Sequence, residues 1–462
     1  MRLLVKNGRI ITATDDYVAD ILVDGEAIAL IGRSLDTAAD TVIDASGRYV
    51  LPGGVDPHVH LENPSGETAT VDTFTTGTAA AAAGGTTTVI DFMTQRRGES
   101  FDAAIDRRMA QLERNRPVVD VGLHMIITDL SGANAGRIPW LVDQGISSFK
   151  MYMAYPARLM VDDTTVFGAL SEAADCGGLV MMHAENGSAI DVLVARALAA
   201  GKTGPKYHAS TRPTLAEAEA THRATMLAEM AGAPIYFVHL SCEEALEHVA
   251  NAHRRGRPVY AETCPQYLFL DDSVYDLPGF EAAKYVFTPP ARPKHHQDAL
   301  WRGLSYHDLS VISTDHCPFC FKGQKEIGRD DFSKIPNGGP GIEHRLMMVH
   351  NGGVRSGRIT LNRMVEVLST APAKLFGLFP RKGTIAVGSD GDLVIFDPNV
   401  RKTLSAATHN SLIDYTPYEG VEVTGAPEVV VSRGTVVYRD DRVVGAAGHG
   451  RFIRRAPHLQ RL

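Results

Sequence analysis

The chain has 462 residues, more than one ordinary hydrophobic core accommodates, so we expect one large domain and a smaller one. Hydrophobic residues make up 44% and charged residues 22%, and the net charge of −8 contains no long block of like charge, which argues against nucleic-acid binding. The sequence has no apolar leader, no run of about 18 apolar residues and only five cysteines, so we expect no membrane partner, a cytoplasmic location and reduced thiols.

Short apolar runs separated by turns occupy both ends of the chain. Near the N-terminus, the runs 3–5 and 9–11 flank Asn7 and Gly8, a pair that predicts a β-hairpin. Runs of the same kind return at 392–396, 428–432 and 434–438.

We expect the two ends to join into one small β-sandwich domain. Its segments are residues 1–52 and 378–450, and residues 451–462 follow as a C-terminal tail. A tail of mixed apolar and basic residues is commonly disordered unless it docks, and we expect it to dock on a neighbouring subunit.

The middle of the chain, residues 53–377, alternates strand-like runs with amphipathic or alanine-rich stretches such as 73–83, 213–230 and 243–253. Eight such β-then-α units predict an α/β fold, a (β/α)8 barrel with a parallel sheet. The eight strand-like runs are 50–60, 86–92, 119–127, 146–151, 178–183, 235–240, 258–262 and 309–315.

Metal-type ligands stand where five of these runs end, which is the rim at which barrel active sites lie. His58 and His60 are two apart on one strand, so both rings point to the same side and can hold one metal. A lone strand-end histidine is usually an ordinary polar residue, and Asp315 alone could cap a helix. The whole set is hard to explain that way: His58, His60, Lys150, His183, His239 and Asp315.

Several segments resemble a known enzyme family. Residues 52–60, Pro-Gly-Gly-Val-Asp-Pro-His-Val-His, resemble the metal-binding opening of the amidohydrolase superfamily. Residues 148–155, Ser-Phe-Lys-Met-Tyr-Met-Ala-Tyr, resemble the lysine segment of dihydropyrimidinases and D-hydantoinases. The resemblance extends from near residue 1 to about residue 450, and further similar segments begin at His183, Val238, Glu262, Asp331 and Arg381.

The resemblance implies two divalent metal ions per subunit, for which imidazole and carboxylate ligands favour zinc. His58, His60 and Asp315 would bind one ion, and His183 and His239 the other. Lys150 would be carbamylated by CO₂ to N6-carboxylysine and bridge both, because a free ammonium would be repelled by two dications. A hydroxide between the metals would attack the ring carbonyl.

The same resemblance assigns the remaining roles. Tyr155 would donate a hydrogen bond to the oxyanion, and Asp315 would pass the proton of the attacking hydroxide to the leaving ring nitrogen. Backbone groups near Thr288 and Asn337 would hold the ring; Thr288 stands where serine is common, which leaves a backbone contact intact. The implied reaction opens 5,6-dihydropyrimidines or 5-monosubstituted hydantoins to N-carbamoyl amino acids, in a homotetramer.

Three other functions occur among related proteins. An allantoinase or dihydroorotase is a related cyclic amidohydrolase, and dihydropyrimidinase-like scaffolds are non-catalytic. Scaffolds lack several metal ligands, whereas this sequence keeps all six and Tyr155. Dihydroorotases usually have arginine two residues after the second histidine, whereas here Leu61 and then Glu62 follow. We expect Glu62 near the mouth to repel a carboxylate; if it faces solvent instead, the missing arginine argues the same way.

Two further expectations concern the surroundings of the site. The segments 62–72 and 152–162 should shape the choice of ring substituent. Cys317 and Cys320 have CxxC spacing, but no second pair accompanies them, so we assign them no metal or redox role.

Overall fold

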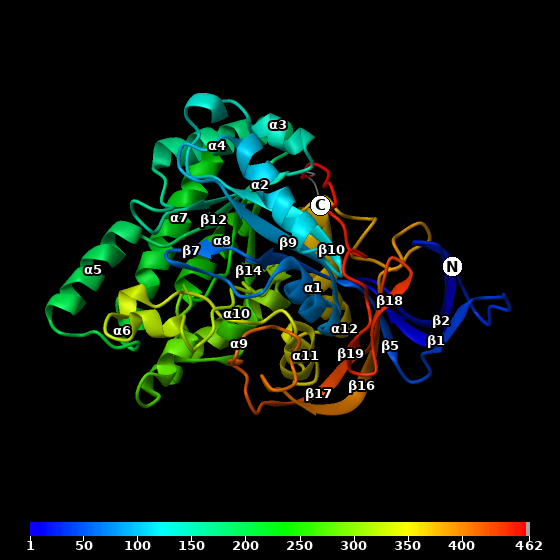
Figure 1. The fold of residues 1–462 in the computed structure, drawn as a ribbon. Coiled ribbons are helices and arrows are strands. Elements are labelled where there is room, and N and C mark those ends of the chain that lie inside the picture. Colours follow the sequence, from blue (N-terminus) through cyan, green and yellow to red (C-terminus); the bar gives the residue numbers. More distant parts are fainter. Residues whose placement is uncertain (459–462) are drawn as a thin grey trace.

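A computed structural model of the protein describes residues 1–458. Its central feature is a sheet of eight parallel strands in which each strand pairs with the next one along the chain (Figure 1). A parallel bridge between Val59 and His316 brings the last strand beside the first. The predicted (β/α)8 barrel is confirmed, and its strands are β6 (Gly54–Val59), β9 (Thr86–Thr94), β10 (Asp120–Ile126), β11 (Ser148–Tyr152), β12 (Leu179–His183), β13 (Ile235–Phe237), β14 (Val259–Thr263) and β15 (Val311–Ile312).

The helices surround the barrel, and their ends carry the expected capping residues. The side chain of Asp162 accepts a hydrogen bond from the backbone N–H of Thr165 at the start of α4, which ends at Gly177 with a left-handed φ of 70°. The helices are α1 (Phe74–Ala83), α2 (Phe101–Arg114), α3 (Ile138–Asp143), α4 (Asp163–Cys176), α5 (Gly187–Ala199), α6 (Tyr207–Ser210), α7 (Thr214–Ala231), α8 (Glu243–Arg254), α9 (Pro265–Phe269), α10 (His295–Ser305), α11 (Arg345–Val349), α12 (Leu361–Val365) and α13 (Ala371–Leu375).

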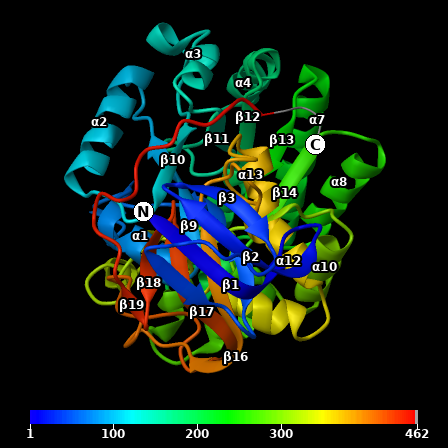
Figure 2. The same cartoon turned by 90° about the vertical axis from the view of Figure 1, so that its right-hand side faces the viewer.

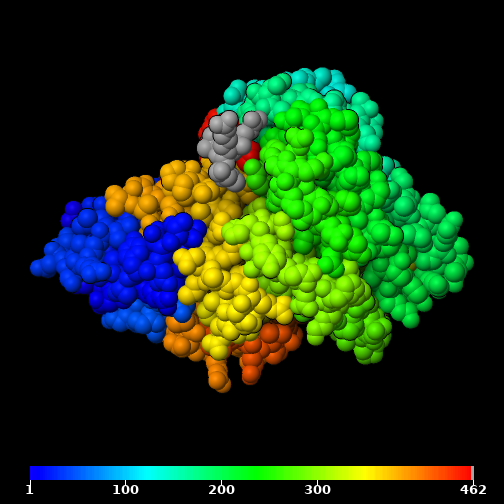
Figure 3. Space-filling view, turned by 180° about the vertical axis from the view of Figure 1, so that it is seen from behind, coloured from blue at the N-terminus to red at the C-terminus, as the bar shows by residue number. Residues whose placement is uncertain are grey.

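The two chain ends form one β-domain, as predicted, at one side of the barrel (Figures 2 and 3). Its strands belong to one connected sheet that encloses its own hydrophobic core, to which both segments contribute: Leu3 and Ile21 from the first, Leu393 and Val431 from the second. The strands are β1 (Arg2–Ile11), β2 (Asp16–Asp24), β3 (Ala27–Gly32), β4 (Thr41–Asp44), β5 (Tyr49–Pro52), β16 (Leu393–Thr403), β17 (Glu422–Ser432), β18 (Thr435–Arg439) and β19 (Arg442–Val443).

The expected hairpin at Asn7 and Gly8 was wrong. Residues 2–11 form a single strand, and the register of β1 against β2 shifts between Val5 and Gly8. Asn7 has a φ of 61°, and its backbone N–H donates to the carboxylate of Asp20 at 2.8 Å. The turn-forming pair therefore makes a β-bulge, which uses the same left-handed backbone as a hairpin turn.

Residues 451–458 of the tail dock on the barrel of their own chain, and residues 459–462 lie outside the described part. Docking of the tail on a neighbouring subunit stays a prediction. The tail crosses the N-terminal end of the barrel strands of its own chain (Figure 2). The backbone N–H of Ile453 donates to the carbonyl of Val121 at 2.9 Å, and the Ile453 side chain joins the cluster inside the barrel. In residues 1–458, no helix has the length and apolar character needed to cross a bilayer.

Candidate active site

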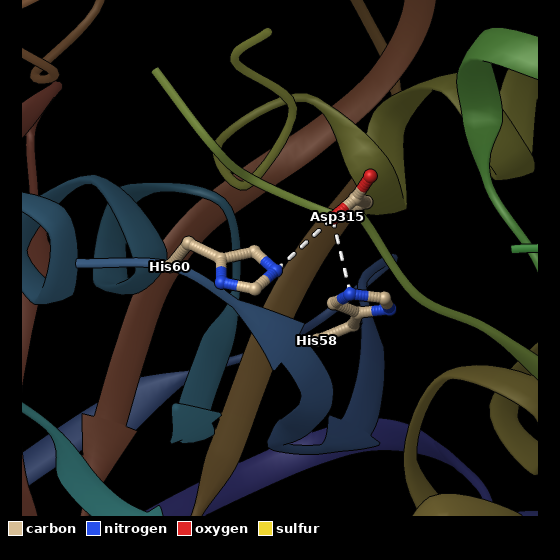
Figure 4. A group of neighbouring side chains, drawn as sticks. All are labelled: His58, His60 and Asp315. Carbon is tan, nitrogen blue, oxygen red and sulfur yellow. Dashed lines mark ion pairs between the residues drawn. The ribbon is translucent and has the colours of Figure 1, made fainter. Parts of the chain in front are cut away.

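His58, His60 and Asp315 form a compact group of ligand-type side chains. Both imidazoles come from β6, and Asp315 follows β15, the strand at which the barrel closes. Oδ1 of Asp315 lies 3.0 Å from Nε2 of His58 and 3.4 Å from Nε2 of His60 (Figure 4). One ligand atom of each residue lies within 4.8 Å of the others, close enough for one metal ion to contact all three.

Lys150 is buried beside this group in the middle of β11, with 1% of its surface exposed. Its Nζ lies 2.8 Å from Nε2 of His58. The other ring nitrogen of His58, Nδ1, contacts the carboxylate of Glu262, which orients the ring and leaves Nε2 for the site. Burial lowers the pKa of Lys150 to about 8, although Asp315 and Glu262 oppose this. Part of the amine is then neutral near physiological pH, the form that can add to CO₂.

His183 and His239 form a second pair, at the ends of β12 and β13. Nδ1 of His183 lies 2.9 Å from Nε2 of His239, and Nε2 of His183 lies 2.9 Å from a carboxylate oxygen of Glu185. Burial holds the pKa of His239 well below its ordinary value. The two ring nitrogens share one proton in this hydrogen bond, and unprotonated ring nitrogens are also the form that binds a metal ion. The rings of His58 and His239 stack at 5.4 Å, which places the pair next to the first group.

A pocket of about 920 Å³ opens above these side chains. Tyr155, Thr288 and Asn337 line its wall together with His60, Lys150, His183, His239 and Asp315. The amide Nδ2 of Asn337 donates to Oη of Tyr155 at 3.5 Å. Burial raises the pKa of Tyr155, so its phenol keeps its proton and can act as a hydrogen-bond donor. All nine residues expected at the site are therefore grouped around one cavity or its floor.

Comparison with known proteins agrees with this geometry. The model of the amidohydrolase family matches residues 49–437. The chain is 50% identical over 459 residues to D-hydantoinase of Geobacillus stearothermophilus, covering 99% of this chain and 97% of that protein. The corresponding values for D-hydantoinase of Streptomyces coelicolor are 50% over 460 residues, 98% and 98%. The crystal structure of dihydropyrimidinase from Brevibacillus agri NCHU1002 matches with a TM-score of 0.97 at 49% identity, over 99% of this chain and 100% of that one.

The chain belongs to the amidohydrolase family. Within it, full-length identity near one half places the chain in the group of D-hydantoinases and dihydropyrimidinases. It is a hydrolase acting on cyclic amides.

The donor set of this amidohydrolase fits divalent metal ions. His58, His60 and Asp315 offer two nitrogens and one oxygen, a combination that zinc and neighbouring transition metals accept. Cys317 and Cys320 do not add to the set: the thiol of Cys317 faces the carbonyl of Asn337, and that of Cys320 faces the carbonyl of Leu412.

Three residues of the site have left-handed backbones. The φ angles are 63° for Tyr155, 42° for His239 and 49° for Asp315. Aspartate and histidine adopt this region more readily than other non-glycine residues, whereas a tyrosine there is unusual. Each residue follows the end of a barrel strand, so the sharp change of direction turns its side chain across the rim.

The loops expected to shape the substrate pocket do line it. Residues 63–68, which include the small hairpin of β7 (Pro64–Ser65) and β8 (Thr68–Ala69), form one side, and Tyr155, Pro156, Arg158 and Leu159 form another. The expectation for Glu62 was wrong. Its carboxylate accepts hydrogen bonds from the backbone N–H of Phe74 and from Asn115, both at 2.9 Å, so it caps α1.

Sequence reasoning assigned no role to two buried carboxylates. Glu262 accepts hydrogen bonds from the phenol of Tyr236 at 2.7 Å and from the backbone N–H of His239 at 3.2 Å, besides contacting His58. Glu185 orients His183. A signal for Glu262 was present, because it ends the seventh strand-like run of the sequence and occupies the same rim as the histidines.

Proposed function

We propose that this chain hydrolyses the ring amide of 5,6-dihydropyrimidines and 5-monosubstituted hydantoins to N-carbamoyl amino acids, with two zinc ions. The observation that carries the proposal is the convergence of six ligand-type side chains from five strands on one rim, beneath the pocket that Tyr155 lines. A non-catalytic scaffold would have no need for these buried polar groups, each of which is costly without a partner.

We assign His58, His60 and Asp315 as the residues that would hold one ion and His183 and His239 as those that would hold the other. A carbamate on Lys150 would add negatively charged oxygen ligands. The short contact between Lys150 and His58 supports this, because a carbamate grown from Nζ would lie among the imidazoles. Bound zinc would bring the pKa of a water molecule toward neutrality and polarise the ring carbonyl.

Residues of the chain bind the ring, stabilise the oxyanion and transfer the proton. Backbone groups at Thr288 and Asn337 hold the ring, and the phenol of Tyr155 donates to the oxygen that becomes negative as water adds to the carbonyl carbon. Asp315 takes the proton of the attacking water and delivers it to the ring nitrogen as the carbon–nitrogen bond breaks. The second proton of the water is released to solvent as the new carboxyl group ionises. Neutral substrate and water thus give one carboxylate, one carbamoyl NH₂ group and one proton, and atoms and charge balance.

Two similar proteins are named D-hydantoinase, which favours 5-substituted hydantoins of D configuration for this chain. Dihydroorotate should be a poor substrate because the two residues after His60 provide no cation for a ring carboxylate. Leu61 is fully buried, and Glu62 is bound to α1. Allantoin, itself a 5-substituted hydantoin, remains the alternative substrate.

A substrate panel on zinc-loaded protein tests the proposal. It contains dihydrouracil, dihydrothymine, hydantoin, D- and L-5-substituted hydantoins, allantoin and dihydroorotate. We expect ring opening of dihydrouracil or a D-hydantoin, and at least about 100-fold lower kcat/KM for dihydroorotate, the order of a lost charged contact. Comparable values for dihydroorotate and dihydrouracil would overturn the assignment.

We further propose a cytoplasmic homotetramer in which residues 1–52 with 378–450, 53–377 and 451–462 form the three structural parts. Only the family resemblance supports the tetramer, because residues 451–458 lie on their own barrel. Light scattering should give about four times 49.9 kDa, and a monomer mass at micromolar protein would refute the assembly.

A further inference from the structure

Lys325 is a buried lysine whose amine donates its hydrogen bonds to backbone carbonyls. It begins the short turn Lys325–Gly328, and none of its surface is exposed. Its Nζ donates to the carbonyls of Val286 at 2.8 Å, Pro336 at 2.7 Å and Gly338 at 2.7 Å. An ammonium group has three protons, so these acceptors satisfy it completely.

No acidic side chain within residues 1–458 forms an ion pair with Lys325. A buried ammonium is costly, and an apolar side chain of similar length would avoid this cost in an ordinary core position. We therefore look for the reason for a lysine at this position in the segments that its three hydrogen bonds hold in place.

The three carbonyls belong to two loops that meet at the pocket. Val286 lies two residues before Thr288, while Pro336 and Gly338 flank Asn337. The backbone N–H of Gly338 also donates to the carbonyl of Val286 at 3.0 Å, so the loops are joined directly as well as through the ammonium. Thr288, Asn337 and Gly338 line the pocket, whereas Lys325 lies behind them and outside its wall.

The backbone of Tyr155 is anchored separately from these loops, whereas its phenol interacts with the side chains of Thr288 and Asn337. Its carbonyl accepts backbone N–H groups of Arg158, Leu159 and Met160, each at 3.1 Å. Its link to Asn337 is a single bond of 3.5 Å. Release of the two loops would thus disturb the peptide groups that face the ring more than the phenol.

We propose that Lys325 is a positioning residue that fixes the peptide groups at Thr288 and Asn337 in the register needed to bind the ring of the substrate. This inference rests on the proposed function, which assigns ring binding to those two loops. Lys325 acts through backbone carbonyls, so its loss should weaken substrate binding while the ligands of the metal site stay in place.

The test compares Lys325→Met and Lys325→Gln with the wild-type protein, each loaded with zinc, on dihydrouracil and a D-5-substituted hydantoin. Methionine removes all three donors, and glutamine keeps two. We expect KM to rise at least about tenfold for Lys325→Met, since small misplacements of binding groups are costly, with kcat within about threefold and zinc content unchanged. Lys325→Gln should show a smaller rise in KM.

Arg455→Met is the matched control. Arg455 is also buried and donates to backbone carbonyls, those of Leu123 and Phe376, but at the opposite end of the barrel. We expect lower thermal stability and an unchanged KM for this control. A KM within twofold of wild type for folded Lys325→Met would overturn the proposal, as would an equal rise for Arg455→Met.

Failure of this proposal and failure of the proposed function give different results. If the Met variant does not fold, Lys325→Gln decides: a raised KM with preserved kcat supports the positioning role, and a KM within twofold of wild type refutes it. If the wild-type protein opens no cyclic ureide, the proposed function fails on its own measurement, and the proposal that rests on it falls with it.

Discussion

Tyr155 combines an unusual backbone conformation with a phenol that keeps its proton. Its φ of 63° lies in a region that tyrosine rarely occupies, and three backbone N–H groups on one carbonyl hold it there. Burial raises the pKa of the phenol, which keeps the proton available for donation. The cost of this conformation is consistent with a residue whose position matters more than its contribution to stability.

Replacing Tyr155 by phenylalanine should therefore affect the transition state. Removing one donor to an oxyanion typically lowers the rate by ~10²–10³. We expect kcat to fall by that order with zinc content unchanged, measured by steady-state kinetics and metal analysis. Tyr306→Phe, at a side chain with 74% of its surface exposed, serves as the control. A rise in KM alone would make Tyr155 a binding residue only.

Lys150 is expected to be essential for metal binding. Lys150→Ala should lose bound metal and activity, because no other side chain can supply the carbamate oxygens. Short carboxylic acids added with zinc should restore part of the activity. Lys202→Ala removes an exposed lysine and should keep full zinc content. A fully active alanine variant, or a crystal structure with a free ammonium beside two occupied metal sites, would contradict the prediction.

The ligand-type residues of the site could be predicted from the sequence, whereas the residues that hydrogen-bond to them could not. Strand-end positions brought His58, Lys150 and Asp315 to one rim, because parallel strands all end on the same side. The partners are set by side-chain direction in three dimensions. Glu62 has the right charge and sequence position for the pocket mouth, yet its backbone turns at a φ of 47° and its carboxylate binds α1.

Hydrophobic periodicity and turn residues were sufficient to predict most of the strands and helices. The strands of the barrel are almost wholly buried, so most of them are rich in apolar residues, and all eight runs correspond to strands. Asn7 and Gly8 failed as a hairpin signal because a β-bulge can also use a left-handed asparagine, as it does here at Asn7. The contacts of the tail with its own barrel could not be predicted, because mixed composition does not reveal which surface a segment covers.

The tail segment closes the N-terminal end of the barrel, and Ile453 is its main apolar anchor. It is 2% exposed and packs in the interior cluster with Phe92, Tyr236 and Phe376. Ile453→Ala should lower the free energy of unfolding by about 2–4 kcal/mol, as other large-to-small core changes do, and leave kcat/KM unchanged. Denaturant unfolding measures this.

Val444→Ala is the comparison for that experiment, since Val444 lies in the same C-terminal region with 55% of its surface exposed. It should change the unfolding free energy by less than about 0.5 kcal/mol. If Ile453→Ala were equally mild, the tail would not stabilise the barrel.

The charge of the whole molecule and that of its pocket mouth have opposite signs. The chain carries a net charge of −8. The exposed part of the pocket wall nevertheless contains Arg96, Arg97, Arg158 and Lys334 against only Glu67 and Asp191. A pocket of about 920 Å³ also leaves room beyond a five- or six-membered ring for a long substituent. The mouth should therefore attract a negative group at the far end of such a substituent.

This arrangement predicts a preference that depends on salt. A hydantoin with a 5-(2-carboxyethyl) group should have a higher kcat/KM than its uncharged 5-(2-carbamoylethyl) analogue. Exposed ion pairs contribute ~0.2–1 kcal/mol, which corresponds to a preference of a few-fold for one pair. The preference should shrink at high ionic strength, because the Debye length falls to about 3 Å at 1 M salt. Dihydroorotate should not benefit, since its carboxylate is attached to the ring and lies deep, near buried Thr288.

Arg158→Gln separates this effect from general electrostatics. It removes one cation of the mouth and should reduce the preference for the carboxylate at low salt, with little change for the uncharged analogue. Arg302→Gln removes an exposed arginine on α10 that pairs with Glu243 away from the pocket, and should leave the preference intact. An uncharged analogue that is the better substrate at every salt concentration would show that the cations of the mouth do not select the substituent, and that the shape of the loops around Pro64 and Leu159 does.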